Sequence, residues 1–137
     1  MKKKVLITGV TGTMGFATLK QFAAHPGEFD VRVLARKSDS NEKLLRPYDG
    51  QIETVWGNLT DDECLRECVR DMDYVLAIGA FVSPMADAHP EECIRTNYGS
   101  TLSMLRSIKE LGQQDKTHFV FIGSVSMYGD RQTPLHW

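Results

Sequence analysis

The sequence predicts an α/β fold in which about five parallel strands form one sheet, with helices wound on both of its faces. Three observations predict it. Short apolar runs rich in β-branched residues alternate with longer stretches whose apolar residues recur at helical spacing. The first run passes through closely spaced glycines into a helix. The 137 residues, 42% of them hydrophobic, have the size and composition of one globular domain.

The first apolar run ends in three glycines, Gly9, Gly12 and Gly15, spaced Gly-x-x-Gly-x-x-Gly. A buried strand over 5–7 must turn sharply there into a helix that begins near Thr13. Glycine allows such a turn and lets a pyrophosphate approach the backbone, while the helix N-terminus attracts phosphates. A glycine loop that only turns the chain is the alternative. The strand before the glycines and the helix after them favour a dinucleotide site.

The remaining elements alternate in the same way. Runs typical of strands occupy 29–35, 52–55, 73–80 and 118–122. Helices are expected within 38–50, after an N-cap at Thr60 or Asp61, and over about 91–111. The buried face of the second of these helices is predicted from Leu65, Cys68, Val69 and Met72, and that of the third from Ile94, Leu102, Leu105 and Ile108. Parallel strands then place the loops at 9–15, 35–37, 57–59, 78–83 and 123–129 at one edge of the sheet.

The end of the second strand bears on the type of cofactor. An NAD site has an acidic residue here for the ribose 2′-hydroxyl, whereas an arginine can pair with the 2′-phosphate of NADP. The chain has Ala35-Arg36-Lys37 and no carboxylate until Asp39. Because a phosphate gains charge-assisted hydrogen bonds from Arg36 and Lys37, NADP is favoured over NAD. A solvated basic turn is the alternative.

Two further positions allow two interpretations each. The small residues Gly79 and Ala80, at the end of the fourth strand, either leave room for a ligand or permit close packing of the next helix. Asn97 lies inside a predicted helix, where asparagine is a poor helix former. Its side chain either faces solvent or hydrogen-bonds a neighbouring loop.

Composition limits the class of protein. A net charge of −2 gives no electrostatic argument for binding nucleic acid, and no 18-residue apolar run predicts a membrane span. An odd number of cysteines, three, fits the reducing cytoplasm. Cys64 and Cys68 share a helix face, so a metal pair is conceivable. No histidine or further cysteine lies at ligand spacing, which favours two small apolar residues and no metal.

Five segments together resemble the extended branch of the short-chain dehydrogenase/reductase family, which comprises sugar-nucleotide epimerases and dehydratases and their reductase relatives. Residues 8–15 are similar to its Thr-Gly-x-x-Gly-x-x-Gly loop, and 57–61 to its Gly-Asp-Leu-x-Asp segment, from which Asn58 departs. Residues 78–80 correspond to its small-residue stretch. Residues 96–101 resemble Asn-Val-x-Gly-Thr, and 121–130 resemble Ser-Ser-x-x-x-Tyr-Gly. The resemblance covers the whole chain and implies a single NAD(P)-binding Rossmann domain over 1–137.

The motifs and the resemblance together give the candidate site residues. The candidate cofactor-binding residues are Gly9, Thr11, Gly12, Thr13, Met14, Gly15, Arg36, Lys37, Asn58, Leu59, Ile78, Gly79, Ala80 and Asn97. The resemblance places Ser124 at the catalytic serine, whose hydroxyl hydrogen-bonds the substrate oxygen.

The resemblance also implies hydride transfer at the nicotinamide, with a tyrosine as acid/base and a lysine in a Tyr-x-x-x-Lys pair. That pair is missing. The residues four positions after Tyr48, Tyr74, Tyr98 and Tyr128 are Ile52, Ile78, Leu102 and Gln132. Tyr128 belongs to the serine segment and is not the missing acid/base.

We therefore expect the amino-terminal portion of an NADP- or NAD-dependent epimerase, dehydratase or reductase, truncated after the fifth strand, with negligible turnover of its own. The catalytic tyrosine-lysine helix and the substrate-binding part would be absent. A non-catalytic module that senses or sequesters a dinucleotide is the alternative. A free edge at the fifth strand, or the helix over 91–111, predicts self-association.

Overall fold

The computed structural model describes residues 1–125 and residue 129. Its sheet contains five parallel strands in the order β3-β2-β1-β4-β5. The strands are β1 (Lys3–Thr8), β2 (Phe29–Ala35), β3 (Ile52–Trp56), β4 (Tyr74–Ala77) and β5 (His118–Phe121). The sequence-based prediction of a five-stranded parallel sheet is confirmed. The strand order reverses at β1, between β2 and β4, and open α/β sheets bind ligands in a crevice at the carboxyl ends of the strands at such a point, here after β1 and β4.

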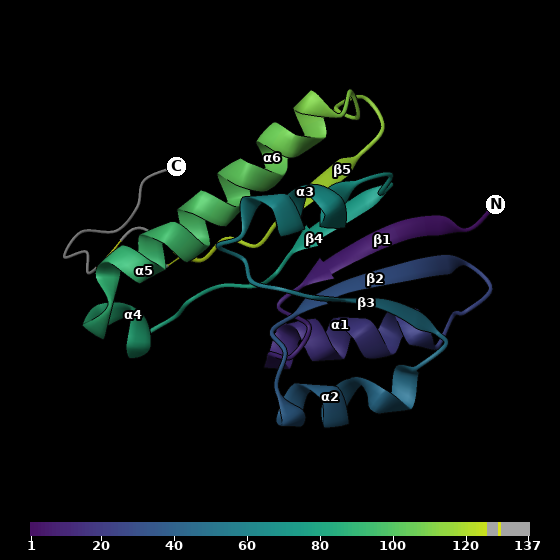
Figure 1. Cartoon of the computed structure of the whole chain (residues 1–137), viewed down its shortest axis with the longest axis horizontal. Helices are drawn as coiled ribbons and strands as arrows, with labels where there is room; N and C mark the ends of the chain where they lie inside the picture. Colours follow the sequence, from purple (N-terminus) through teal and green to yellow (C-terminus); the bar gives the residue numbers. More distant parts are fainter. Residues whose placement is uncertain (126–128, 130–137) are drawn as a thin grey trace.

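Helices cover both faces of the sheet (Figure 1). One face carries α1 (Thr13–Ala23) and α2 (Asp39–Leu45), which continues into the 3-10 helix η1 (Arg46–Tyr48). The other face carries α3 (Asp62–Val69) and α6 (Ser100–Glu110). Two short helices, α4 (Met85–Ala88) and α5 (Pro90–Ile94), precede the π-helical segment η2 (Arg95–Gly99). They lie toward the carboxyl ends of the strands in Figure 1. Among the described residues, every helix is too short or too polar to cross a membrane.

Side chains of β1 point alternately to the two faces of the sheet, and they contribute to a separate hydrophobic core on each face. Val5 and Ile7 pack into the cluster shared with α1, whereas Leu6 packs into the cluster shared with α3 and α6. All three side chains are buried, as expected of a central parallel strand covered on both faces. The predicted buried face of α3 is also confirmed for Leu65, Cys68 and Val69, which belong to the second of these clusters. Met72 belongs to the same cluster but lies after the helix, which ends at Val69.

Several predicted boundaries were wrong. The fourth strand ends at Ala77, so Ile78, Gly79 and Ala80 belong to the loop and not to the strand. The loop between this strand and the long helix contains α4, which the pattern did not predict. Strands β1 and β3 extend beyond the predicted ranges, and β5 ends one residue earlier at Phe121.

The predicted helix over 91–111 is interrupted by η2, and its predicted stripe was partly wrong. Ile94 and Leu105 are 63% and 43% exposed. The buried residues of α6 are Ser100, Met104, Ser107 and Ile108. Two of them are serines, whose small side chains let α6 approach its neighbours, and a search for apolar spacing passes over such positions. The π-helical turn also changes the phase between Ile94 and the rest of the helix.

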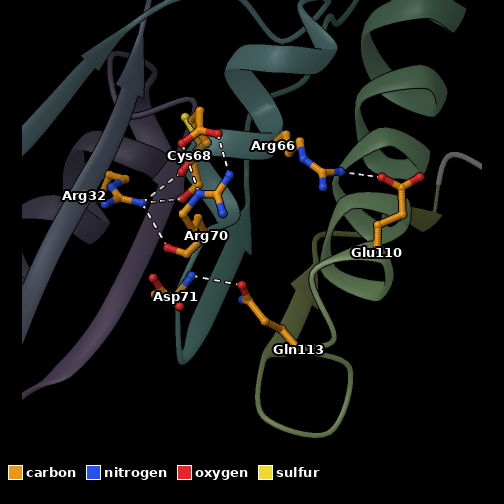
Figure 2. A network of polar contacts seen from close by, with 8 residues as sticks. Arg32, Arg66, Cys68, Arg70, Asp71, Glu110 and Gln113 are labelled. Carbon is orange, nitrogen blue, oxygen red and sulfur yellow. Dashed lines mark hydrogen bonds and ion pairs between the residues drawn. The ribbon is translucent and has the colours of Figure 1, made fainter.

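The end of the sheet opposite the crevice is held by a polar network (Figure 2). Arg32 Nη1, from β2, donates to the carbonyl oxygens of Glu67, Cys68 and Arg70 at 3.0, 3.0 and 3.2 Å. These carbonyls lie at the carboxyl end of α3, where helix carbonyls lack the usual partners, and that of Glu67 also accepts from the Arg70 N–H at 3.3 Å. Gln113 Oε1 accepts from the backbone N–H of Asp71 at 3.1 Å. These hydrogen bonds therefore fix the end of α3 and the turn after it relative to β2 and to the segment after α6.

Candidate dinucleotide site

The turn after β1 has the backbone geometry that its glycines predict. Gly9 has φ +67°, a left-handed conformation that favours glycine. The Gly12 N–H donates to the Gly9 carbonyl over 3.0 Å, which closes the turn directly before α1. Gly12 is the N-cap of α1, no side chain caps it, and the first turn of the helix contains no acidic residue. The N–H groups and positive dipole end of α1 therefore remain suited to phosphate.

Three glycines pack too closely to carry side chains. A Cβ on Gly15 would lie 2.1 Å from the Gly9 carbonyl oxygen, and one on Gly9 would lie 2.4 Å from Gly79 Cα. A Cβ on Gly79 would lie 2.8 Å from Leu59 Cδ1. The closest neighbours of a side chain at Gly79 would be Leu59 and the glycine turn, not the next helix, so neither interpretation of this residue is confirmed.

Gly12 differs from these three glycines and provides a test of fit for a phosphate group. It is exposed, and a Cβ there would meet only the Gly9 carbonyl oxygen, at 3.4 Å. The fold itself accepts a side chain at this position. Such a side chain would instead occupy space in front of the turn, where a pyrophosphate would approach the backbone. Thr11, Thr13 and Met14 lie in the same turn, half-buried or exposed.

Thr8 is a site residue that the sequence reasoning did not select. Its side chain is fully buried, and its Oγ1 accepts a hydrogen bond from the Gly79 N–H at 3.1 Å. The hydroxyl donates to the Leu76 carbonyl oxygen at 3.5 Å. Thr8 thus joins the end of β1 to the loop after β4 at the crevice. A hydroxyl residue directly before the first glycine was the signal available in the sequence.

Asn97 hydrogen-bonds a neighbouring loop, the second of its two interpretations. Its Oδ1 accepts from the Phe81 N–H at 2.7 Å, and its Nδ2 donates to the Phe81 carbonyl oxygen at 2.9 Å. Nδ2 also lies 3.3 Å from Cys93 Sγ, and the Thr101 hydroxyl donates to the Asn97 carbonyl at 2.8 Å. Asn97 therefore fixes the loop that begins with Ile78, Gly79 and Ala80.

The loop after β2 presents both predicted cations to solvent. Arg36 and Lys37 are exposed. Asn41 Nδ2 donates to the Arg36 carbonyl oxygen at 2.7 Å, and Lys37 Nζ lies 3.9 Å from Glu42 Oε1. Ser38 caps α2 by accepting from the Asn41 N–H at 3.2 Å.

The loop after β3 contains Asn58 and Leu59. Asn58 is exposed, and its Oδ1 accepts from the Thr60 N–H at 3.3 Å, so its side-chain nitrogen is the group that a base could use. Asp61, one of the two predicted N-caps, accepts from the Glu63 and Cys64 N–H groups at 3.1 and 3.0 Å.

The structure brings the predicted residues to the carboxyl ends of the strands, as far as it describes them. Ser124 is exposed after β5, and Tyr128 lies outside the described residues. A groove of about 590 Å³ between α3 and α6 is lined by Leu59 but by none of the other predicted site residues.

Cys64 and Cys68 have the properties of apolar residues. Burial raises the pKa of both thiols, that of Cys68 to about 12. Within residues 1–125 and at residue 129, no group of three histidine, cysteine or acidic side chains is arranged to hold a metal ion.

The profile of the NAD dependent epimerase/dehydratase family matches residues 5–136. The chain belongs to this family. It is 29% identical to D-erythronate dehydrogenase of Cupriavidus necator over 137 aligned residues, which cover 96% of this chain and 41% of that enzyme. It is 26% identical to the inverting UDP-N-acetylglucosamine 4,6-dehydratase of Campylobacter jejuni, with 81% of this chain and 34% of that enzyme covered.

Solved structures of other proteins share the fold of this chain. The UDP-Glc/GlcNAc 4-epimerase of Campylobacter jejuni matches with a TM-score of 0.81 and 20% identity, over 98% of this chain and 41% of that one. A short-chain dehydrogenase/reductase superfamily protein of Agrobacterium tumefaciens, solved with bound NAD, matches with a TM-score of 0.61 and 28% identity, over 80% and 30%. The chain thus spans less than half the length of these relatives.

Proposed function

We propose that this chain is the dinucleotide-binding part of an NAD(P)-dependent epimerase, dehydratase or reductase, with NADP preferred. The observation that carries the proposal is the junction of Gly9, Gly15 and Gly79, which places the uncapped N-terminus of α1 beside the loop after β4. Membership of the family supports nicotinamide dinucleotide binding, as does the relative solved with bound NAD. The exposed Arg36 and Lys37 support the preference for NADP.

Different residues of the chain would bind different parts of the cofactor. The N–H groups at the start of α1 would hold the pyrophosphate. Asn58 and Leu59 would contact the adenine, and Arg36 the ribose 2′-phosphate. The loop at 78–80, held by Thr8 and Asn97, would support the nicotinamide half. When bound, the cofactor supplies a hydride acceptor or donor, and the Ser124 hydroxyl would hydrogen-bond the substrate oxygen.

The substrate class that we propose is a hydroxylated carbon compound oxidised or reduced at one alcohol or carbonyl group. The relatives support it by their names, which include a sugar-acid dehydrogenase and a sugar-nucleotide dehydratase. Because the sequence has no Tyr-x-x-x-Lys pair, we expect the 137-residue chain to bind cofactor weakly and to have no dehydrogenase activity of its own. Its three free cysteines fit a cytoplasmic location.

The test is equilibrium binding of NADPH and NADH to the 137-residue chain, followed by cofactor fluorescence and by calorimetry. Saturable binding with a lower Kd for NADPH is expected. An Arg36→Ala variant should lose affinity for NADPH and keep its affinity for NADH. Equal losses for the two cofactors would remove the basis for the NADP preference, and no binding of either would overturn the proposal.

A second candidate is a non-catalytic module that senses or sequesters a dinucleotide, which would use the same glycine turn and helix N-terminus. The two candidate functions predict different masses for the native polypeptide. An antibody against this chain, used on a lysate of the source cells, should detect a protein much larger than 15.4 kDa if the chain is part of an enzyme. A native mass of 15.4 kDa would support the binding module.

A further inference from the structure

The two cations after β2 have different surroundings. Lys37 Nζ lies 3.9 Å from the Glu42 carboxylate, in the first turn of α2. Arg36 forms no ion pair with any of the described residues, although its side chain is exposed beside the same loop. A carboxylate therefore lies beside this loop, in the first turn of α2 and three residues beyond Asp39, and it is paired with one of the two cations.

The backbone of this loop is also held in place. Asn41 Nδ2 donates to the Arg36 carbonyl oxygen at 2.7 Å, and the Asn41 N–H donates to Ser38 Oγ at 3.2 Å. The side chain and the backbone of one residue in α2 thus contact both ends of the segment 36–38. Because Arg36 has a fixed backbone and no ion-pair partner within residues 1–125 or at residue 129, it is better placed than Lys37 to meet an anion at the end of β2.

We propose that Glu42 limits the preference of this site for NADP, by holding Lys37 away from the ribose 2′ position so that Arg36 alone contacts a 2′-phosphate. The inference rests on the dinucleotide binding proposed above. Each cation that reaches a phosphate dianion adds a charge-assisted hydrogen bond, and a nearby carboxylate opposes the phosphate. Removal of the Glu42 charge therefore releases Lys37 for a second contact, which NADH, lacking the phosphate, does not use.

The distance and exposure of the Lys37–Glu42 pair also limit the expected gain in NADPH affinity. The pair is exposed and its atoms are 3.9 Å apart, and exposed pairs of this kind are weak. We therefore expect the Glu42→Gln substitution to strengthen NADPH binding about two- to fivefold, without a change in NADH binding. The gain should decrease as salt is added, because ions screen exposed charges.

The experiment measures the Kd of NADPH and of NADH for the 137-residue chain and four variants. Glu42→Gln should raise the ratio of the NADH Kd to the NADPH Kd. Lys37→Ala should change this ratio little in the wild-type background and abolish the gain in the Glu42→Gln background. Glu28→Gln is the control, because it removes the same charge from an exposed glutamate just before β2, at the opposite end of that strand.

Three outcomes would overturn the inference while leaving dinucleotide binding intact. They are an unchanged ratio in Glu42→Gln, an equal gain in Glu28→Gln, and a gain that persists when Lys37 is also replaced. Competition by adenosine 2′,5′-bisphosphate provides a second readout, since only this half of the cofactor contacts the loop, and it should show the same gain. Failure of the wild-type chain to bind either cofactor would overturn the proposed function itself, and the inference with it.

Discussion

The side chain of Asn97 is hydrogen-bonded twice to the backbone of a single residue, Phe81. The Phe81 N–H donates to Oδ1 over 2.7 Å and Nδ2 donates to the Phe81 carbonyl over 2.9 Å. An amide side chain offers a donor and an acceptor at the spacing of a peptide group, so it can replace a strand neighbour. Asn97 does this where β4 has already ended, and it holds the backbone of the loop beside the glycine turn.

Replacement of Asn97 should therefore affect the loop more than the fold. We expect Asn97→Ala to weaken dinucleotide binding about tenfold and to lower the free energy of unfolding by about 1–2 kcal/mol, because two backbone groups lose their partner. Cofactor titration and urea unfolding measure the two quantities. The neighbouring Tyr98, which is 66% exposed, provides the control, and Tyr98→Ala should leave the cofactor Kd unchanged. An unaltered Kd in Asn97→Ala would contradict the role assigned to this side chain.

Alanine substitutions in the glycine turn should have two different effects, one on stability and one on cofactor affinity. Gly15→Ala places a Cβ 2.1 Å from the Gly9 carbonyl oxygen, so we expect a loss of more than about 3 kcal/mol in unfolding free energy. Gly12→Ala meets only an ordinary contact and should lose about 1 kcal/mol or less, as a weaker N-cap. Its cofactor affinity should nevertheless fall at least tenfold. Thermal unfolding and cofactor titration of both variants distinguish packing from binding, and tight cofactor binding by Gly12→Ala would argue against the pyrophosphate position.

Arg32 provides a test at the opposite end of the sheet. Arg32→Met keeps the aliphatic stem but removes the Nη1 donor from the Glu67, Cys68 and Arg70 carbonyl oxygens, of which that of Glu67 keeps a backbone donor, the Arg70 N–H, so we expect unfolding free energy to fall by about 2–4 kcal/mol. Glu53→Gln, which alters only the more exposed partner, should have a much smaller effect. Cofactor affinity should stay the same in both folded variants. A large loss of affinity in Arg32→Met would show that the two ends of the sheet are coupled.

Cys68 gives a prediction for pH dependence. Burial raises the pKa of its thiol to about 12, so the folded state keeps the proton while the unfolded state, with an ordinary thiol pKa near 9, releases it. Stability from this group is complete below about pH 9 and is lost as the pH rises toward 12. Cys68→Ala should therefore show a shallower loss of stability between pH 8 and pH 10.5 in urea unfolding. Parallel stability curves for the two proteins would contradict the buried, neutral thiol.

Self-association remains a prediction, and the structure allows its two proposed surfaces to be separated. At the edge formed by β5 among the described residues, Phe121 is 61% exposed, and on α6 Leu105 is exposed. We expect light scattering to show an oligomer of the 137-residue chain, because unpaired edges and exposed apolar side chains promote association. Phe121→Lys should dissociate an edge-to-edge assembly and Leu105→Lys a helix-to-helix assembly. A monomer at high concentration of the wild-type chain would refute both.

Local patterns in the sequence were sufficient for the sheet and for the glycine turn. Val5, Leu6 and Ile7 followed by Gly9 specify a buried strand that must turn, and this relation holds within a few residues. The α3 face was predictable for the same reason, because helical spacing places Leu65, Cys68 and Val69 together. Arg36 and Lys37 were also visible in the sequence, since they follow a strand directly.

Contacts between distant segments were not predictable in this way. Thr8 meets Gly79, and Arg32 meets the end of α3, across 71 and at least 35 residues of sequence. Nothing in the local pattern near Arg32 distinguishes it from a solvated strand residue. The ion pair between Glu42 and Lys37 was not predictable for a related reason, because it depends on how the chain turns from the loop into α2. The partner of Asn97 likewise depends on where the β4 loop lies.

The π-helical segment η2 limits which insertions and deletions the helical stretch from α5 to α6 can tolerate. Such a segment is equivalent to one residue inserted into an α-helix, so the turns before and after it are about 100° out of phase with an uninterrupted helix. Cys93, before this segment, and Asn97, within it, are directed to the loop at Phe81, whereas Met104 and Ile108, after it, face the core. Deletion of a single residue within 95–99 would restore a regular helix and rotate one of these sets away from its target. The length of this segment is thus under tighter constraint than the identity of its exposed side chains.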